Sequence, residues 1–267
     1  MQSSDPKEAR RAELEQALGE PMTLDGLTRE WKIFQRRRGH RHSTDDLLTG
    51  WYAVTKVASA RRLLDLGSGV GSVGLLALSR YPDATLTAIE AQEQSFRLLC
   101  ENVAANGLSA RVITLHGDLR TTAVAAGSYD LVTGSPPYFD VKDGIVPADS
   151  QKAHARFELR GDVRDYALAA ARALAPGGRF IFCFPSAQKA RAVAACTATP
   201  LFIVSQRDVV PRAGVAPLFT LFECAHEALG ATRLEPDYLV RDAQGVQTAE
   251  HAATRSIFGM GLGNGPG

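Results

Sequence analysis

The feature that most constrains the fold is an alternation that begins at Arg61, in which short apolar runs typical of buried strands take turns with segments of helical periodicity. Strands separated by helices are joined by right-handed crossovers, which align the strands in parallel and place helices on both faces of the sheet. The connection between the last two apolar runs, residues 211–216, is short enough for a hairpin, so the final strand is expected to be antiparallel. The sequence therefore predicts an α/β fold with a doubly wound, mostly parallel sheet of seven strands and an antiparallel last strand. The strands are expected at 61–67, 84–90, 110–118, 129–135, 179–185, 201–210 and 217–226, and the helices between them at 72–81, 91–107, 162–178 and 186–198.

The length of 267 residues, with 45% hydrophobic and 22% charged residues, allows one sizeable core. We expect three regions: an N-terminal helical extension with a basic segment at 1–60, the main domain at 61–258, and a disordered glycine-rich tail at 259–267. Within the extension, Asp5 as N-cap and Pro6 at the first helical position predict a helix that ends at Leu18. A second helical pattern starts near Thr44.

Composition narrows the class of protein. The formal net charge of +1 argues neither for nor against nucleic acid, so any basic footprint must be local. The four cysteines form no CxxC pair, which favours reduced thiols and no metal site. The N-terminal segment is charged and lacks the apolar core of a signal peptide, and no run approaches the roughly 20 apolar residues of a membrane span. We therefore expect a soluble cytoplasmic protein that does not bind membranes.

A glycine-rich turn joins the first expected strand to the first helix of the alternation. Gly67, Gly69 and Gly71 allow the backbone to turn tightly and to approach a ligand closely. The spacing of Gly69, Gly71 and Gly74 also matches the GxGxxG pattern of dinucleotide-binding enzymes, so a nicotinamide-dependent dehydrogenase is one candidate.

Three acidic residues at strand ends indicate the chemical class of the ligand. Asp65, expected in the turn before the glycines, would repel a pyrophosphate but suits a cationic ligand. Glu90 ends the next strand, where a carboxylate can accept both ribose hydroxyls, and Asp118 follows the third strand, where it could accept from an adenine amino group. A ligand with a ribose, an adenine and a positive charge, rather than a pyrophosphate, is S-adenosylmethionine.

The segment after the fourth expected strand reads "TGSPPYF". Pro136 and Pro137 make a stiff backbone without N–H donors, so a neighbouring carbonyl is held rigidly and has no competing donor. An exocyclic amine or an amide nitrogen is a poor nucleophile, and its N–H groups can be held by Ser135 and by that carbonyl. The ring of Tyr138 can stack on a planar acceptor.

The residues "LDLGSGVG" resemble the first motif of class I S-adenosylmethionine-dependent methyltransferases, and "SPPY" resembles the (Asn/Asp/Ser)-Pro-Pro-(Tyr/Phe) motif of amino methyltransferases. The N-terminal "FQRRRGHRHSTDDLLTGWYA" and the C-terminal "VVPRAGVAPLFTLFE" and "DYLVRDAQGVQTAEHAATRSIF" are similar to the bacterial tRNA-valine adenine-N6 methyltransferase family, over about residues 31–258. This resemblance implies a Rossmann-like fold, S-adenosylmethionine as cofactor with S-adenosylhomocysteine as product, and tRNA or another RNA as partner. It implies catalytic roles for Ser135, Pro136, Pro137 and Tyr138, and a cofactor site formed by Asp65, Gly67, Gly69, Gly71, Glu90, Asp118 and Ser135. The adenine-N6 enzymes most often have Asn at the position of Ser135, whereas Ser is familiar in cytosine-N4 enzymes.

A basic cluster at residues 36–42 concentrates positive charge in a near-neutral chain and can contact phosphates or form a solvated loop. The candidate substrate contacts are Arg37, Arg38, Arg41, Phe139 and Arg156. Lys152, His154 and Arg160 lie on the same segment as Arg156, which could close over a substrate. Asp45 and Asp46 can cap the helix that starts there or contact the methionine amino group of the cofactor. We interpret His116 and His226 as core or edge residues.

The leading hypothesis is an N-methyltransferase that acts on an exocyclic amino group, with adenine N6 in tRNA as the first choice. A protein glutamine-N5 methyltransferase and a small-molecule N-methyltransferase remain alternatives. The glutamine enzymes share the Pro-Pro-Tyr loop but usually have Asn before it and a distinct N-terminal helical domain, for which the roughly 60 residues before the glycine turn are few. A cofactor-binding protein without catalysis is the alternative from another class.

Overall fold

A mixed sheet forms the centre of the protein, whose computed structural model describes residues 5–138, 149, 151 and 161–261. In this part of the chain the strand order is β10-β8-β9-β7-β6-β3-β4-β5, with β11 also paired to β8. The parallel strands follow each other at β3 (Arg62–Leu66), β4 (Thr85–Glu90), β5 (Val112–His116), β6 (Tyr129–Gly134), β7 (Leu174–Pro185) and β8 (Phe202–Val210). The last long strand, β9 (Phe219–Ala225), lies between β7 and β8 and is antiparallel to both. The predicted Rossmann-like α/β fold with an antiparallel last strand is confirmed, and two short strands, β10 (Arg233–Leu234) and β11 (Tyr238–Leu239), extend the expected sheet at β8.

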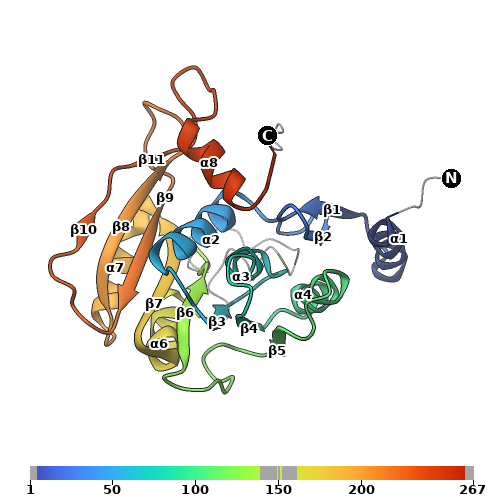
Figure 1. Ribbon diagram of the computed structural model, residues 1–267, viewed down its shortest axis with the longest axis horizontal. Coiled ribbons are helices and arrows are strands. Elements are labelled where there is room, and N and C mark those ends of the chain that lie inside the picture. The colour runs from blue at the N-terminus through green and yellow to red at the C-terminus, as the bar shows by residue number, and fades with distance from the viewer. Residues whose placement is uncertain (1–4, 139–148, 150, 152–160, 262–267) are drawn as a thin grey trace.

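Helices cover both faces of the sheet (Figure 1). One face carries α2 (Thr44–Lys56), α3 (Ser72–Leu78) and α4 (Glu93–Ala105), with α8 (Ala249–Ile257) against α2. The other face carries α6 (Val163–Ala173) and α7 (Lys189–Thr197), which follows the short 3-10 turn η1 (Ser186–Gln188). Each face has its own apolar core, and the core under α6 and α7 contains the stacked rings of Phe180, Phe182 and Phe222.

Strand β7 begins earlier than the sequence predicts. We expected the helix over 162–178 to continue to the Pro-Gly-Gly triplet, but α6 ends at Ala173 and Leu174 already pairs with Tyr129 of β6. Pro176 explains the early end, because a proline disfavours helical backbone in the residue before it. The pairing then shifts register between Tyr129 and Leu131, which absorbs the intervening residues.

The N-terminal extension contains the predicted helix α1 (Pro6–Leu18), whose N-cap Asp5 accepts from the N–H of Lys7. The sequence did not predict the next element, an antiparallel hairpin of β1 (Met22–Gly26) and β2 (Lys32–Arg36). The fully buried amide of Asn102 fixes this hairpin to the domain: its Oδ1 accepts from the N–H of Phe34 at 2.7 Å, and its Nδ2 donates to the carbonyls of Phe34 and Val70.

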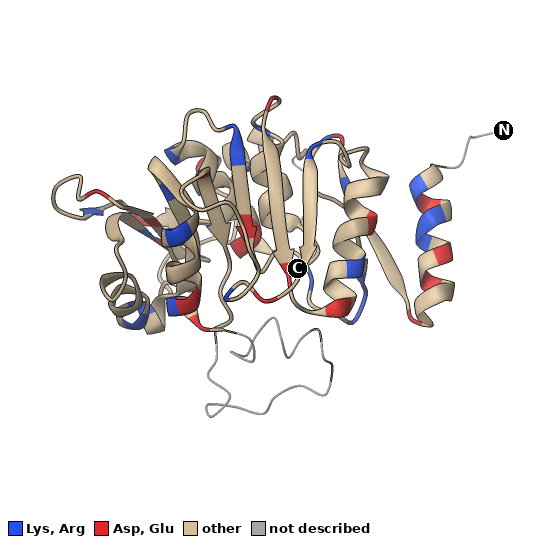
Figure 2. Ribbon diagram, turned by 90° about the horizontal axis from the view of Figure 1, so that it is seen from below, with Lys and Arg blue, Asp and Glu red and all other residues tan. Residues whose placement is uncertain are grey.

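Helix α1 lies at one end of the molecule, beside α4, and carries charges of both signs (Figure 2). Leu14 is its buried contact, and Arg10 reaches the carboxylate of Glu101 on α4 at 2.7 Å. The expected tail at 259–267 is described only as far as Gly261, so most of that prediction lies outside the described residues. Among the described helices, none is long and apolar enough to cross a bilayer.

Candidate active site

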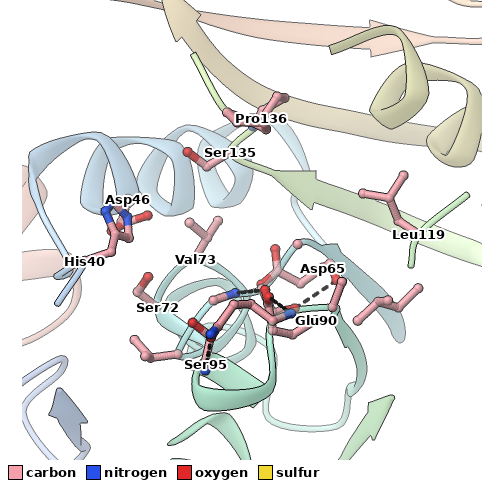
Figure 3. Close-up of a pocket in the computed structure, with 18 of the residues that line it drawn as sticks. His40, Asp46, Asp65, Ser72, Val73, Glu90, Ser95, Leu119, Ser135 and Pro136 are labelled. Atoms are coloured by element: carbon pink, nitrogen blue, oxygen red, sulfur yellow. Dashed lines mark hydrogen bonds between the residues drawn. The ribbon is translucent and has the colours of Figure 1, made fainter. Parts of the chain in front are cut away.

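A cavity of about 420 Å³ opens at the edge of the sheet where β3, β4 and β6 end. Ser135 and Pro136, which follow β6, lie on one side of it, and Glu90 and Ser95 lie on the opposite side (Figure 3). Helix α2 contributes Asp46 to a third side, next to His40. The lining residues are His40, His42, Ser43, Asp45, Asp46, Asp65, Gly67, Ser68, Gly69, Val70, Ser72, Val73, Ile89, Glu90, Ala91, Gln92, Ser95, Gly117, Leu119, Ser135, Pro136, Pro137, Tyr138, Gln151, Gly161 and Tyr166.

The glycine turn forms the floor of the cavity through Gly67 and Gly69. Gly67 has a φ of +61°, and a Cβ on it would lie 2.0 Å from the hydroxyl oxygen of Tyr166. Any side chain there would therefore be strained and would collide with α6. The predicted roles of Gly67 and Gly69 agree with this position, whereas Gly71 does not line the cavity and instead precedes Ser72 as the N-cap of α3.

Asp65 lies inside strand β3 rather than in the turn, and it is 1% exposed. Its carboxylate accepts from the Thr133 hydroxyl at 2.7 Å and from the N–H of Gly74 at 3.2 Å. A Cβ on residue 74 would lie 2.8 Å from that carboxylate, so this glycine is needed for the close approach of α3 to Asp65. Burial raises the pKa of Asp65 to about 6, because the described surroundings supply hydrogen bonds but no cation.

Glu90 ends β4 and is held by the backbone on both sides. Its two oxygens accept from the N–H of Gly69 at 2.8 Å and from the N–H of Gln92 at 2.7 Å. Burial nevertheless raises the pKa of Glu90 to about 7. Two neighbouring buried carboxylates with raised pKa values make the cavity suited to a ligand that brings hydroxyl donors and positive charge.

Asp118 does not line the cavity, although its neighbours Gly117 and Leu119 do. Its carboxylate accepts from the guanidinium of Arg120 at 2.6 and 2.9 Å. The predicted contact between Asp118 and an adenine amino group therefore has no support from its position in this structure.

The acceptor loop, which we define as residues 135–138, follows β6 and forms the wall above the glycine turn, so all four of its predicted catalytic residues line the cavity. The hydroxyl of Tyr138 donates to Asp45 of α2 at 2.8 Å. The backbone carbonyl of Tyr138 accepts from the side chain of Gln188 at 2.9 Å. The ring packs edge-on against Phe184 at 6.0 Å. Phe139 lies outside the described residues.

Behind the acceptor loop lies Cys183 of β7, which is fully buried. Its sulfur is 3.4 Å from the hydroxyl oxygen of Ser135 and 3.4 Å from that of Tyr138. Burial raises the pKa of this thiol to about 12, so it stays protonated at physiological pH.

The basic cluster at residues 36–42 contains arginines held in internal ion pairs and arginines that are exposed. Arg36 is only 8% exposed and pairs with Glu20 at 2.6 Å and with Asp149 at 2.8 Å, so it is a structural residue. Arg36 also contacts the amide of Gln151, which is buried and lines the cavity.

The remaining arginines of the cluster differ in accessibility. Arg41 pairs with Asp25 at 2.9 Å, which leaves it less suited to the predicted substrate role. Arg37 and Arg38 are exposed, and neither forms an ion pair with any described residue. Arg156 and the other basic residues of its segment are not among the described residues.

Helix α2 brings Asp45 and Asp46 to the cavity. Asp46 forms a capping box with Ser43, as the capping interpretation predicts, and its carboxylate lies 3.5 Å from the ring of His42. His116 stacks on Phe96 and does not line the cavity, and nor does His226.

The sequence did not single out Tyr166, Gln92, Ser95 or Gln151 as lining residues. Tyr166 could not be found from its pattern, because it occupies a buried position on an amphipathic helix and reads as a core residue. Within the described residues, no group of three or more metal-ligating side chains comes together.

Comparison with known proteins identifies the family. The family description "Methyltransferase small domain" matches residues 51–195. A tRNA1(Val) (adenine(37)-N6)-methyltransferase from Aeromonas hydrophila is 32% identical over 187 residues, which covers 70% of this chain and 77% of that protein. A protein of the same name from Tolumonas auensis is 29% identical, over 72% of this chain and 79% of its own length. Another from a Flavobacteriaceae bacterium is 26% identical, over 73% of this chain and 81% of its own length.

Solved structures with the same fold include a predicted O-methyltransferase from Agrobacterium tumefaciens, with a TM-score of 0.62, 18% identity and coverage of 80% of this chain and 96% of that one. A tRNA methyltransferase from M. jannaschii matches with a TM-score of 0.54 and 15% identity over 76% of this chain and 54% of that one. At these identities the structures show a shared fold alone. Taken with the sequence matches, the chain belongs to the methyltransferase small-domain family and, within it, to the family of the tRNA1(Val) (adenine(37)-N6)-methyltransferases.

Proposed function

We propose that this protein methylates the exocyclic N6 amino group of an adenine in tRNA. The observation that carries the proposal is a cavity with two buried carboxylates on one side and the acceptor loop on the other. Relatives named as tRNA1(Val) adenine-N6 methyltransferases support the choice of acceptor. A tRNA acceptor also supports a cytoplasmic location.

The cofactor of the family, S-adenosylmethionine, fits the residues present. Glu90 has the position and the accepting oxygens for two ribose hydroxyls, and the buried carboxylates lack a cation among the described residues. Asp65 disfavours the dehydrogenase interpretation, because a pyrophosphate at the glycine turn would lie beside this buried carboxylate, whereas Glu90 could hold the ribose of either ligand. When bound, S-adenosylmethionine supplies an electrophilic methyl group and leaves as S-adenosylhomocysteine.

The chain itself contributes positioning. Ser135 and the carbonyl of Pro136 accept the two N–H bonds of the adenine amine, and this turns the nitrogen lone pair toward the cofactor side of the cavity. The ring of Tyr138 stacks on the base, a contribution of about 1–3 kcal/mol. Catalysis then depends on preorganised hydrogen bonds and on the alignment of the reacting atoms, without an obligatory general base.

The exposed pair Arg37 and Arg38 lies directly before His40, which lines the cavity. We assign these two side chains to contacts with tRNA phosphates, because neither is engaged within the described structure. Arg36 and Arg41 are left out of this role because of their internal ion pairs.

Incubation of the purified protein with labelled S-adenosylmethionine and unmodified bulk tRNA, followed by mass spectrometry of the nucleosides, tests the proposal. N6-methyladenosine is the expected product, and Ser135→Ala should lower its yield. Methylcytosine would mean that Ser135 selects a different base. Label transferred only to a peptide glutamine or to a small molecule would contradict the tRNA assignment.

A further inference from the structure

Four polar groups from three elements meet behind the acceptor loop. The carboxylate of Asp45 on α2 accepts from the hydroxyl of Tyr138 at 2.8 Å. The Tyr138 hydroxyl lies 3.4 Å from the sulfur of Cys183, and the same sulfur lies 3.4 Å from the hydroxyl of Ser135. The contacts therefore run without interruption from Asp45 through Tyr138 and Cys183 to Ser135.

The carboxylate of Asp45 fixes the direction of the first proton in this series and leaves the Tyr138 oxygen available as an acceptor. An ionised carboxylate can only accept, so the Tyr138 proton points to Asp45. The Tyr138 oxygen is then left with lone pairs and can accept the one proton of the Cys183 thiol, 3.4 Å away. The Cys183 sulfur in turn is free to accept from Ser135. Thr49 also lies beside Cys183 and donates its own proton to the backbone carbonyl of Asp45 at 2.7 Å, so its oxygen can only accept the thiol proton, and this too leaves the sulfur to accept from Ser135.

The direction matters because Ser135 lines the cavity at the position proposed to hold the substrate amine. An Asn side chain carries an oxygen that only accepts, whereas a serine hydroxyl has a proton that would meet the N–H of the incoming amine. We propose that Asp45, through Tyr138 and Cys183, turns the Ser135 proton away from the cavity and so makes Ser135 an obligate acceptor for the substrate amine. Asp45 and Cys183 are thus positioning residues. This inference rests on the proposed function, because it concerns the same amine.

A mutant cycle on Cys183 tests the inference. In the wild-type background Cys183→Ala should lower kcat on tRNA by about tenfold, with little change in KM or in the dissociation constant of S-adenosylmethionine. In a Ser135→Ala background the same change should have no further effect. In a Ser135→Asn background it should also have no effect, because an amide oxygen needs no partner to keep its proton away.

Cys224→Ala is the matched control, since Cys224 is equally buried on the neighbouring strand β9 but faces Cys196 in the other core. It should leave kcat unchanged in every background. An equal loss of kcat from Cys183→Ala in all three backgrounds would mean that the thiol only fills space, and would overturn the proposal. No loss in the wild-type background would overturn it as well.

The Asp45 end is tested separately by Asp45→Ala, which should lower kcat while the affinity for S-adenosylmethionine is retained. A loss of cofactor affinity with unchanged kcat would make Asp45 a cofactor contact instead. A melting cycle needs no acceptor: Asp45→Ala and Tyr138→Phe should each lower Tm, and the double variant should lower it no further than the larger single change. Additive losses of Tm would mean that Asp45 and Tyr138 do not interact, and would overturn the proposal. A wild-type protein that is inactive on tRNA would contradict only the proposed function.

Discussion

Replacement of Glu90 by glutamine should make the cofactor-free protein more stable relative to wild type as the pH rises, while it weakens cofactor binding. Glu90 is a buried carboxylate whose ordinary pKa of 4.5 is raised to about 7 by burial. A pKa that is higher in the folded state means that the folded protein holds its proton more tightly than the unfolded chain does. The contribution of this group to stability is therefore fully present below about pH 4.5 and is lost as the pH rises to about 7.

The size of the effect follows from the two pKa values. Their difference corresponds to about 3 kcal/mol in the free energy of unfolding, since one pKa unit is worth about 1.4 kcal/mol. About 2.5 kcal/mol of this falls between about pH 5 and about pH 8. Glutamine has no charge to bury, but its amide replaces a carboxylate that accepts from Gly69 and Gln92. That replacement adds an offset that does not depend on pH, so only the pH-dependent part is diagnostic.

Urea unfolding of both proteins, without cofactor, at about pH 5 and about pH 8 measures this part. The stability of Glu90→Gln relative to wild type should increase by about 2.5 kcal/mol between the two conditions. Calorimetry at neutral pH should show at least about tenfold weaker binding of S-adenosylmethionine, because an amide cannot accept equally from two ribose hydroxyls. Glu13→Gln is the control, since the Glu13 side chain is 63% exposed and its partner Arg10 stays charged at both pH values, so it should give a flat difference. A flat difference for Glu90→Gln would refute the burial argument.

Three further changes test other parts of the structure. Gly67→Ala should weaken binding of S-adenosylmethionine by more than about tenfold in calorimetry, because its Cβ meets the Tyr166 hydroxyl at 2.0 Å, and Tyr166→Phe should recover part of the loss. Arg37→Ala combined with Arg38→Ala should weaken tRNA binding and reduce the slope of log affinity against log salt by about 2, with Tm unchanged. Asn102→Ala should destabilise the fold by about 2–4 kcal/mol in urea unfolding, because it leaves buried backbone groups of the hairpin and of the glycine turn without partners.

The sequence predicted those features that depend on local backbone chemistry. The strand–helix alternation, Gly67 and the proline pair each require a particular local conformation, and each lies where it was expected. Asp65 and Glu90 line the cavity as expected, although Asp65 lies inside β3 rather than in the turn, and their contacts with the cofactor stay predictions.

The features that were missed depend on tertiary contacts. The β1–β2 hairpin has short strands and is fixed by Asn102, which lies 68 residues away in sequence from its partner Phe34. Arg36 was grouped with its neighbours by charge, and its ion pairs with Glu20 and Asp149 distinguish it as structural. Asp118 differs from these, because its carboxylate pairs locally with Arg120, two residues on, and its contact with an adenine stays a prediction.

The place of β9 in the sheet has a consequence for synthesis of the chain on the ribosome. Strand β9 is the last long strand to be made, yet it lies inside the sheet, between β7 and β8, and all of its residues are buried. Until residue 225 has emerged, the edge of β7 is open and β8 lacks the partner that joins it to the rest of the sheet. A nascent or truncated chain therefore presents an unpaired edge at Phe180–Phe184, of the kind that promotes aggregation. The sheet is therefore completed late. The part of the sheet behind the acceptor loop depends on β9, although β9 contributes no residue to the cavity.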